Sequence, residues 1–155
     1  MNEKLIYSKK AQIILVLLRL ILGYHFLFEG INKLLSPQWS AAPFLLQANW
    51  LFSGFFHYLA SNDTLLQIVN FLNIWGQIFI GIGLIAGLFS FAAAVAGAVL
   101  MAFYYIAMPP FMVNSIFVDK NLLEFFCFLI IIIFPSGNIL GLDRLIEKYR
   151  SVKNG

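Results

Sequence analysis

The chain has 155 residues, of which 61% are hydrophobic and only 11% are charged. Soluble domains are about half apolar and a quarter charged, so the composition excludes an ordinary soluble protein and indicates one integral membrane domain. The net charge of +3 does not indicate nucleic-acid binding, because the basic residues gather at the two ends of the chain and form no groove-lining patch.

Four stretches are apolar and long enough to cross a bilayer, which requires about 17 to 25 residues. They cover about residues 11–31, 68–87, 91–109 and 121–138. The chain opens like a signal peptide, but Arg19 interrupts the apolar run and no small-residue cleavage site follows, so we expect the first stretch to be a retained span. The sequence therefore predicts an all-α membrane protein, a four-helix transmembrane bundle forming a single domain over residues 1–155.

The distribution of basic residues predicts how this bundle lies in the membrane. An even number of spans brings both termini to one side, and most lysines and arginines lie in the terminal segments, whereas the connections on the other side carry only Lys33 and Lys120. By the positive-inside tendency we expect cytoplasmic N- and C-termini in a bacterial inner membrane.

The connection between the first two spans, about residues 36–62, is rich in aromatic residues, unlike a solvated loop. It predicts an extra interfacial helix at about residues 41–60 in this first outer loop. Two interpretations are open. The aromatic residues form either a belt that anchors the protein at the membrane surface or a lid over a site for an apolar ligand.

The first span carries charged and small residues on the same helix face. Arg19, Gly23, Phe26, Gly30 and Lys33 recur at steps of four, three, four and three, which places them on one face. Since small residues mark helix contacts within membranes, we expect this face to look into the bundle. Arg19 either extends toward the cytoplasmic headgroups as an anchor or turns inward to bind a ligand.

Polar side chains of all four spans fall at similar depths toward the outer surface, as a site in the core of a bundle requires. The candidate residues for binding the carbonyl groups or the charge of a ligand are Arg19, Lys33, Asn73, Gln77, Tyr104 and Tyr105. The candidate catalytic residues, which would donate and accept protons, are His25, Glu29 and Glu124.

Each ionisable candidate also has a structural interpretation. Glu29 and Lys33 are spaced i,i+4, so in the simplest interpretation they neutralise each other. His25 and Glu29 have the same spacing and can form a hydrogen-bonded pair that relays a proton. Glu124 either pairs with Lys120 at the membrane edge or turns into the bundle.

The sequence gives little support to other redox or metal chemistry. Its single cysteine, Cys127, excludes a dithiol within the chain. It carries no haem, flavin or iron–sulfur motif. We also expect no metal site, because only one pair of residues, His25 with Glu29, has the spacing of metal ligands. A redox role therefore needs a cofactor such as quinone and a redox partner protein.

Several features together resemble one known family. A tight turn follows the second span, and the residues that carry the resemblance are Arg19, Gly23, Phe26, Gly30 and Lys33 in the first span and Gly141 and Asp143 after the last. In these features the sequence resembles the DoxX/DoxD-like membrane family, which includes the small membrane subunit of thiosulfate:quinone oxidoreductase. The resemblance covers most of the chain.

The resemblance implies a quinone-interacting accessory subunit of a membrane oxidoreductase that acts on sulfur compounds or in thiol stress. Electrons would pass from a sulfur compound, through a redox partner protein, to quinone. An alternative from a different class is a non-catalytic membrane scaffold or a small-anion carrier, in which Arg19 and Lys33 attract the anion. Four spans without a visible inverted repeat would then call for a homo-oligomer.

Overall fold

The computed structural model describes residues 8–114 and 117–153. Every regular element in these two ranges is a helix, so the predicted all-α class is confirmed. In chain order the elements are α1 (Lys9–Leu34), α2 (Ala42–Leu46), α3 (Ser53–Ser61), α4 (Asp63–Ala86), α5 (Ser90–Ala107), α6 (Phe111–Asn114), α7 (Lys120–Ile133), the 3₁₀ turn η1 (Ser136–Asn138) and α8 (Leu142–Lys153).

Three of the described helices, α1, α4 and α5, are long and apolar enough to cross a membrane. α7 is shorter than the predicted span over residues 121–138, because its helix ends at Ile133. Pro135 has no amide hydrogen to continue the helical ladder and disfavours helical geometry at the residue before it. The predicted span over residues 121–138 therefore contains both this helix and the turn that follows it.

Local signals define where the long helices begin and turn. The side chains of Ser8, Asn62 and Asp119 each accept a hydrogen bond from the amide three residues ahead, which caps α1, α4 and α7. At the end of α4, Gly87 adopts a left-handed conformation with φ of 60°. The chain then turns directly into α5, which forms the tight hairpin that the sequence predicts.

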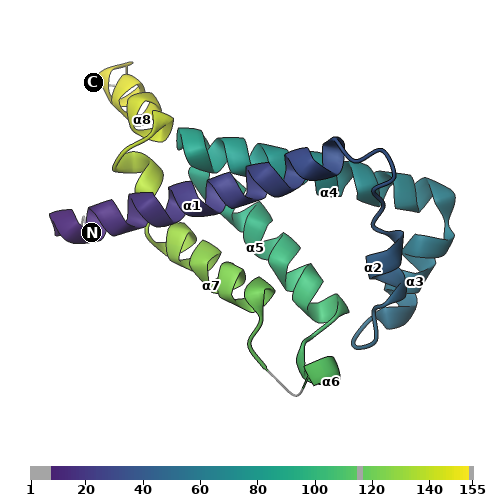
Figure 1. The fold of residues 1–155 in the computed structure, drawn as a ribbon. Coiled ribbons are helices and arrows are strands. Elements are labelled where there is room, and N and C mark those ends of the chain that lie inside the picture. The colour runs from purple at the N-terminus through teal and green to yellow at the C-terminus, as the bar shows by residue number, and fades with distance from the viewer. Residues whose placement is uncertain (1–7, 115–116, 154–155) are drawn as a thin grey trace.

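α1 and α4 lie side by side and run in opposite directions (Figure 1). A Cβ atom on Gly23 would lie 2.9 Å from the side chain of Ile85, and one on Gly30 would lie 2.7 Å from the side chain of Ile78. The two glycines of the first span therefore allow a backbone approach that a larger residue would prevent. The face that carries them looks into the bundle, as predicted.

α7 runs antiparallel to α5 over nearly the whole length of α5. At one end Tyr105 donates its hydroxyl hydrogen to the carbonyl of Phe117 at 2.8 Å. At the other end Gly137, just after α7, lies against Ser90, the first residue of α5. The segment from Phe117 to Gly137 thus matches α5 in extent although its helix is shorter.

The centre of the bundle is an apolar core. Phe26 of α1 and Phe128 of α7 meet edge to face there, with ring centroids 4.9 Å apart. The other buried members of this core are Leu22, Ile80, Leu84, Ala94, Ala98, Met101 and Ile131. The core separates two ends of the molecule, which we call the α3 end, where α2 and α3 lie, and the α8 end, where α8 and the start of α1 lie (Figure 1).

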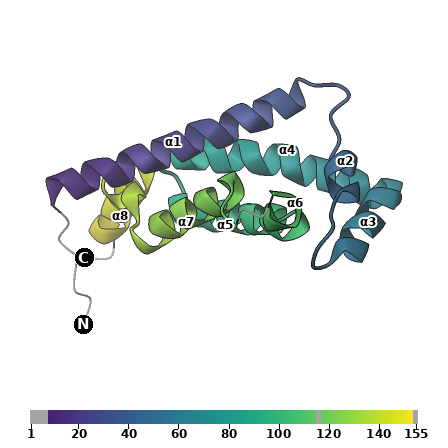
Figure 2. The same ribbon diagram turned by 60° about the horizontal axis from the view of Figure 1, so that its bottom comes forward.

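The predicted single helix over residues 41–60 is two short helices, α2 and α3. The chain turns between them, and there the Asn49 amide donates to the Ala107 carbonyl at the end of α5. Leu45, Phe56 and Ala107 form a second buried apolar cluster that attaches both helices to the bundle. Figure 2 shows α2 and α3 beyond the end of α1, beside the first half of α4.

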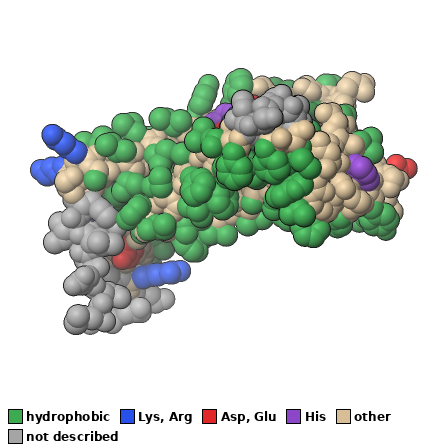
Figure 3. Space-filling model, turned by 90° about the horizontal axis from the view of Figure 1, so that it is seen from below, with side chains coloured by type: hydrophobic (Ala, Val, Ile, Leu, Met, Phe, Trp, Pro, Cys, Tyr) green, Lys and Arg blue, Asp and Glu red, His purple; other side chains and the backbone are tan. Residues whose placement is uncertain are grey.

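The surface of the long helices is strongly apolar. In Figure 3 hydrophobic side chains cover the middle of the face, and lysine and arginine side chains gather at the α8 end. On α1 alone, Ile21, Tyr24 and Phe28 are large exposed side chains. Such a continuous apolar surface is typical of a protein embedded in lipid.

Candidate polar site at the α3 end

A cluster of polar side chains lies at the α3 end, where α1, α4 and α5 meet. The ammonium group of Lys33 on α1 donates to Asn73 Oδ1 at 2.8 Å and to Gln77 Oε1 at 2.7 Å, both on α4. It also lies 3.4 Å from the hydroxyl oxygen of Tyr104 on α5. The structure therefore brings four of the predicted ligand-binding residues together.

The directions of these hydrogen bonds leave one donor free. Because an ammonium group can only donate, the oxygen of the Asn73 amide must face Lys33, so its NH₂ group faces and donates to Tyr104. The Tyr104 oxygen thus accepts hydrogen bonds from Asn73 and Lys33. Within the described residues its own O–H has no acceptor, so Tyr104 can donate to a ligand.

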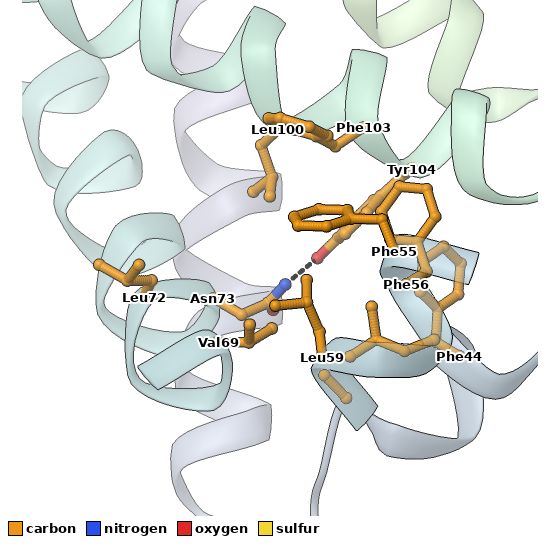
Figure 4. A pocket seen from close by; sticks show the side chains of 12 residues that line it. Phe44, Phe55, Phe56, Leu59, Val69, Leu72, Asn73, Leu100, Phe103 and Tyr104 are labelled. Carbon is orange, nitrogen blue, oxygen red and sulfur yellow. Dashed lines mark hydrogen bonds between the residues drawn. The ribbon is translucent and has the colours of Figure 1, made fainter. Parts of the chain in front are cut away.

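Two cavities meet at the Asn73–Tyr104 hydrogen bond. The larger one has a volume of about 280 Å³, and its walls are aromatic and aliphatic side chains of α2, α3, α4 and α5, with Asn73 and Tyr104 as the polar members (Figure 4). The smaller one, of about 190 Å³, is lined by the same two residues and by Lys33, Trp39 and Ser40. An apolar chamber and a polar chamber are therefore adjacent.

The segment after α1 closes the polar chamber. Lys33 Nζ lies 5.0 Å from the centroid of the Trp39 ring, a cation–π distance. Asn70 holds this segment against α4, because its Oδ1 accepts from the Ala41 amide at 2.8 Å. Trp39 and Ser40 are not among the site residues that the sequence predicts, because no helical spacing relates a loop residue to a lysine on the preceding helix.

His25 and Glu124, two of the predicted proton-transfer residues, form a pair between α1 and α7. His25 Nε2 lies 3.1 Å from Glu124 Oε1. The partner of His25 is thus Glu124 and not the i,i+4 neighbour Glu29. Among the residues that the structure describes, Glu124 forms no ion pair with Lys120, although the two charges interact at longer range. Within the described residues Glu29 forms no ion pair with Lys33, although it interacts electrostatically with both Lys33 and Glu124.

Tyr105 does not belong to the polar site. Its hydroxyl donates to the Phe117 carbonyl, and its ring packs against Phe111 and Phe117, with centroids 6.5 and 6.2 Å away. Adjacent helical residues point about 100° apart, so Tyr104 faces the site whereas Tyr105 faces the segment that leads into α7. The structure therefore does not bring Tyr105, one of the predicted ligand-binding residues, together with Tyr104.

Arg19 lies in a separate place near the α8 end. Its side chain is only 2% exposed, and Nη2 donates to the Leu140 carbonyl at 2.6 Å. Its guanidinium also abuts Gly87, where a Cβ would lie 2.8 Å from Nη1. Arg19 therefore turns inward and does not extend toward headgroups, but Lys33 is roughly 20 Å away along α1, so the two cations do not share a site.

Asp143 joins the start of α8 to the α4–α5 turn. Its carboxylate accepts from the amides of Phe89 and Ser90 at 2.7 and 2.9 Å and from the Ser90 hydroxyl at 2.6 Å, and its own amide donates to the Gly87 carbonyl. Burial alone would raise the pKa of Asp143, but these hydrogen bonds and the charge of Arg19 outweigh it and hold the pKa below its usual value.

Metal ligation has no support in the geometry of the described residues, because no three histidine, cysteine, aspartate or glutamate side chains gather there as a metal site would need. Cys127, the single cysteine, is partly buried on α7 next to the apolar core. The polar cluster around Lys33 instead offers hydrogen-bonding groups and one positive charge.

Comparison with known proteins bears on the same helices. No curated protein and no solved structure matches the chain. Residues 14–110, more than half of the chain, match the DoxX family, and this segment contains Lys33, Asn73, Gln77 and Tyr104. α7 and α8, with Glu124 and Asp143, follow the matched segment. Because the match spans the helices that build the polar site and more than half of the chain, the chain belongs to the DoxX family of membrane proteins.

Proposed function

We propose that this chain is a quinone-interacting accessory subunit of a membrane oxidoreductase that acts on sulfur compounds or in thiol stress. The observation that carries the proposal is the Tyr104 hydroxyl, whose O–H has no acceptor among the described residues and lies where the apolar chamber meets the polar one. A quinone carries carbonyl acceptors on a flat apolar ring. It therefore fits a site with one well-placed donor beside apolar walls.

The chamber suits such a headgroup in size and lining. Its volume of about 280 Å³ is just below the range of roughly 300–1,000 Å³ that is usual for ligand sites, so it would hold a ring but no long chain. The ring of Phe44 lies 5.2 Å from that of Tyr104 and offers an aromatic surface beside the donor. Lys33 adds positive potential, which favours a carbonyl oxygen at this end.

The packing of α7 on α5 supports four membrane spans. The segment from Phe117 to Gly137 runs along the whole of α5, so both would cross the same thickness of bilayer. Both termini would then lie on one side, and the basic residues near them favour a cytoplasmic location in a bacterial inner membrane. The polar site would lie toward the outer side, beneath α2 and α3.

Two electrons and two protons convert a quinone to a quinol. The electrons would come from a redox partner protein that oxidises the sulfur compound, since a single cysteine offers no dithiol. The His25–Glu124 pair can hold and release a proton, because imidazole and carboxylate are hydrogen-bonding partners within 3.1 Å. Glu29, on the same helix between His25 and Lys33, is a third proton-holding group.

One observation favours a non-catalytic scaffold as the second candidate. The Lys33 ammonium already has protein acceptors in Asn73 and Gln77, as a folding device would need. The related idea of a small-anion carrier has less support, because Arg19 and Lys33 lie on opposite sides of the fully buried Phe26, Leu84 and Phe128.

Removal of single hydroxyl groups tests the proposal. We expect Tyr104→Phe to weaken binding of 2,3-dimethoxy-5-methyl-1,4-benzoquinone, measured by calorimetry on the purified chain, by about threefold to tenfold, the worth of one hydrogen bond. Tyr105→Phe, the matched control, loses a hydroxyl that bonds to the loop and should bind as the wild type does. Equal affinity of the wild type and Tyr104→Phe would overturn the proposed site.

A second measurement separates the redox subunit from the scaffold. Native membranes that retain the partner proteins are supplied with thiosulfate, and quinone reduction is followed spectroscopically. Tyr104→Phe should slow this reduction while the complex stays assembled. A scaffold would give the opposite result, with unchanged quinone reduction in every variant that still assembles.

A further inference from the structure

We infer that the ligand of this site carries a long apolar tail and reaches the site sideways from the lipid, through a gap between α3 and α5. The inference rests on the proposed function, because it takes the polar head of the ligand to be a quinone ring beside Tyr104. It adds the class of quinone, one with an alkyl or isoprenoid tail, and the route by which it binds.

A third cavity carries the inference. It has a volume of about 320 Å³ and is lined by Phe52, Phe55, Phe56, Phe103 and Ile106, from α3, the residue before it and α5. Three of these residues, Phe55, Phe56 and Phe103, also line the apolar chamber of about 280 Å³. The two cavities are therefore adjacent, and in Figure 4 side chains of α3 and α5 meet around the chamber.

The three cavities form a series of decreasing polarity. The polar chamber has Lys33, the apolar chamber shares Asn73 and Tyr104 with it, and the third cavity has only aromatic and aliphatic residues. This sequence matches an amphiphile with one polar head and one apolar tail. A small hydrophilic anion has no apolar surface to bury, so the last two cavities would add no free energy to its binding.

The third cavity opens at the surface of the protein. Phe52, Phe55 and Phe103 are each more than half exposed, and they lie on the apolar surface that faces lipid in a membrane protein. Since the chamber at Tyr104 is large enough for a ring only, the tail of a bound quinone must extend outside it. The gap between α3 and α5 gives that tail an apolar path of side chains.

The experiment compares two quinones that differ in the tail alone. Binding of 2,3-dimethoxy-5-methyl-1,4-benzoquinone and of its 6-decyl derivative is measured on the full chain in nanodiscs. We expect the decyl compound to bind at least tenfold more tightly to the wild type. Ile106→Trp, which narrows the third cavity without lining the chamber, should remove most of this difference and leave the tail-less compound unaffected.

Phe79→Trp is the matched control, because Phe79 is an exposed aromatic residue on α4 that lines none of the three cavities. If Ile106→Trp does not fold, a decyl quinone with a photoreactive diazirine at the end of its tail is cross-linked to the wild type. The label should then be recovered on peptides that contain residues 52–56 or 103–106.

The outcomes distinguish this inference from the proposed function. If both quinones bind equally, or the label falls elsewhere, the lateral route is wrong while the head site stands. If Ile106→Trp weakens both compounds alike, the third cavity does not select the tail, and the inference is again wrong. If neither quinone binds the wild type, the proposed function fails and the inference fails with it.

Discussion

Asn73 on α4 donates from its amide nitrogen to the hydroxyl oxygen of Tyr104 on α5, and Lys33 fixes this direction by occupying the amide oxygen. The hydrogen bond joins two helices and at the same time leaves the Tyr104 O–H without an acceptor among the described residues. The residues that join the helices are therefore also the ones that the proposed quinone would contact, and variants can separate the two roles.

Asn73→Asp should remove the free donor without weakening the fold. A carboxylate only accepts, so it would keep Lys33 as a partner and take the Tyr104 proton for itself. We expect a loss of benzoquinone affinity of about threefold to tenfold in calorimetry, as for Tyr104→Phe, with no fall in melting temperature. Asn70→Asp, one turn earlier on α4, is the control, since its Oδ1 already accepts from Ala41. If Asn73→Asp binds normally, the ligand does not use Tyr104.

Lys33→Met should destabilise the protein. It leaves the amide oxygens of Asn73 and Gln77 buried without their donor, which costs about 1–3 kcal/mol per unsatisfied group. Thermal unfolding in detergent should give a melting temperature lower by several degrees, in keeping with that loss. An unchanged melting temperature would mean that the ammonium group does not hold α1 to α4.

The sequence predicts the depth of the polar residues well and their partners poorly. The steps from Arg19 to Lys33 define a helix face, and counting residues from the helix ends brings Asn73, Gln77 and Tyr104 to the depth of Lys33. Depth does not give the direction in which a side chain points around the helix axis, however. Depth alone therefore places Tyr104 and Tyr105 in one site, although the two side chains point in different directions.

Pairing across helices is hidden in the sequence for a different reason. Neighbours at i,i+4 can be recognised from spacing, so spacing alone predicts Glu29 as the partner of His25. Its actual partner, Glu124, lies on another helix, and that contact depends on the angle at which α1 crosses α7. The position of Trp39 over Lys33 depends in the same way on the path of a loop.

The His25–Glu124 pair should appear as a coupling in a double-mutant cycle. His25→Gln and Glu124→Gln each break the pair, and the double variant should lose less stability than the sum of the two, with a coupling of about 0.5–3 kcal/mol. Glu124→Gln should also slow thiosulfate-dependent quinone reduction in native membranes without changing quinone affinity. Additive losses of stability would contradict the pairing.

Asp143 should make the attachment of α8 sensitive to acid. Its pKa is lower in the folded state than in the unfolded state, so its carboxylate stabilises the fold above the unfolded pKa of about 3.9, and this contribution is lost as the pH falls through the folded pKa. Asp143→Asn should lower the melting temperature at pH 7, and its difference from wild type should shrink in strong acid. A difference independent of pH would argue against the carboxylate.

Arg19→Ala should reduce assembly and leave the ligand site intact. It removes the buried donor to Leu140 and leaves a space beside Gly87, where α1, the α4–α5 turn and the segment before α8 meet. We expect a lower yield of folded protein in size-exclusion chromatography. Arg19→Lys keeps the charge and a donor near Leu140, so it should recover part of that yield.

Quinone binding distinguishes this structural role from a direct contact between Arg19 and the ligand. Because Arg19 lies roughly 20 Å from Lys33 along α1 and the apolar core lies between them, the folded fraction of Arg19→Ala should bind benzoquinone as tightly as the wild type does. A well-folded Arg19→Ala protein that has lost binding would mean that a ligand reaches the α8 end, and that the site extends through the bundle.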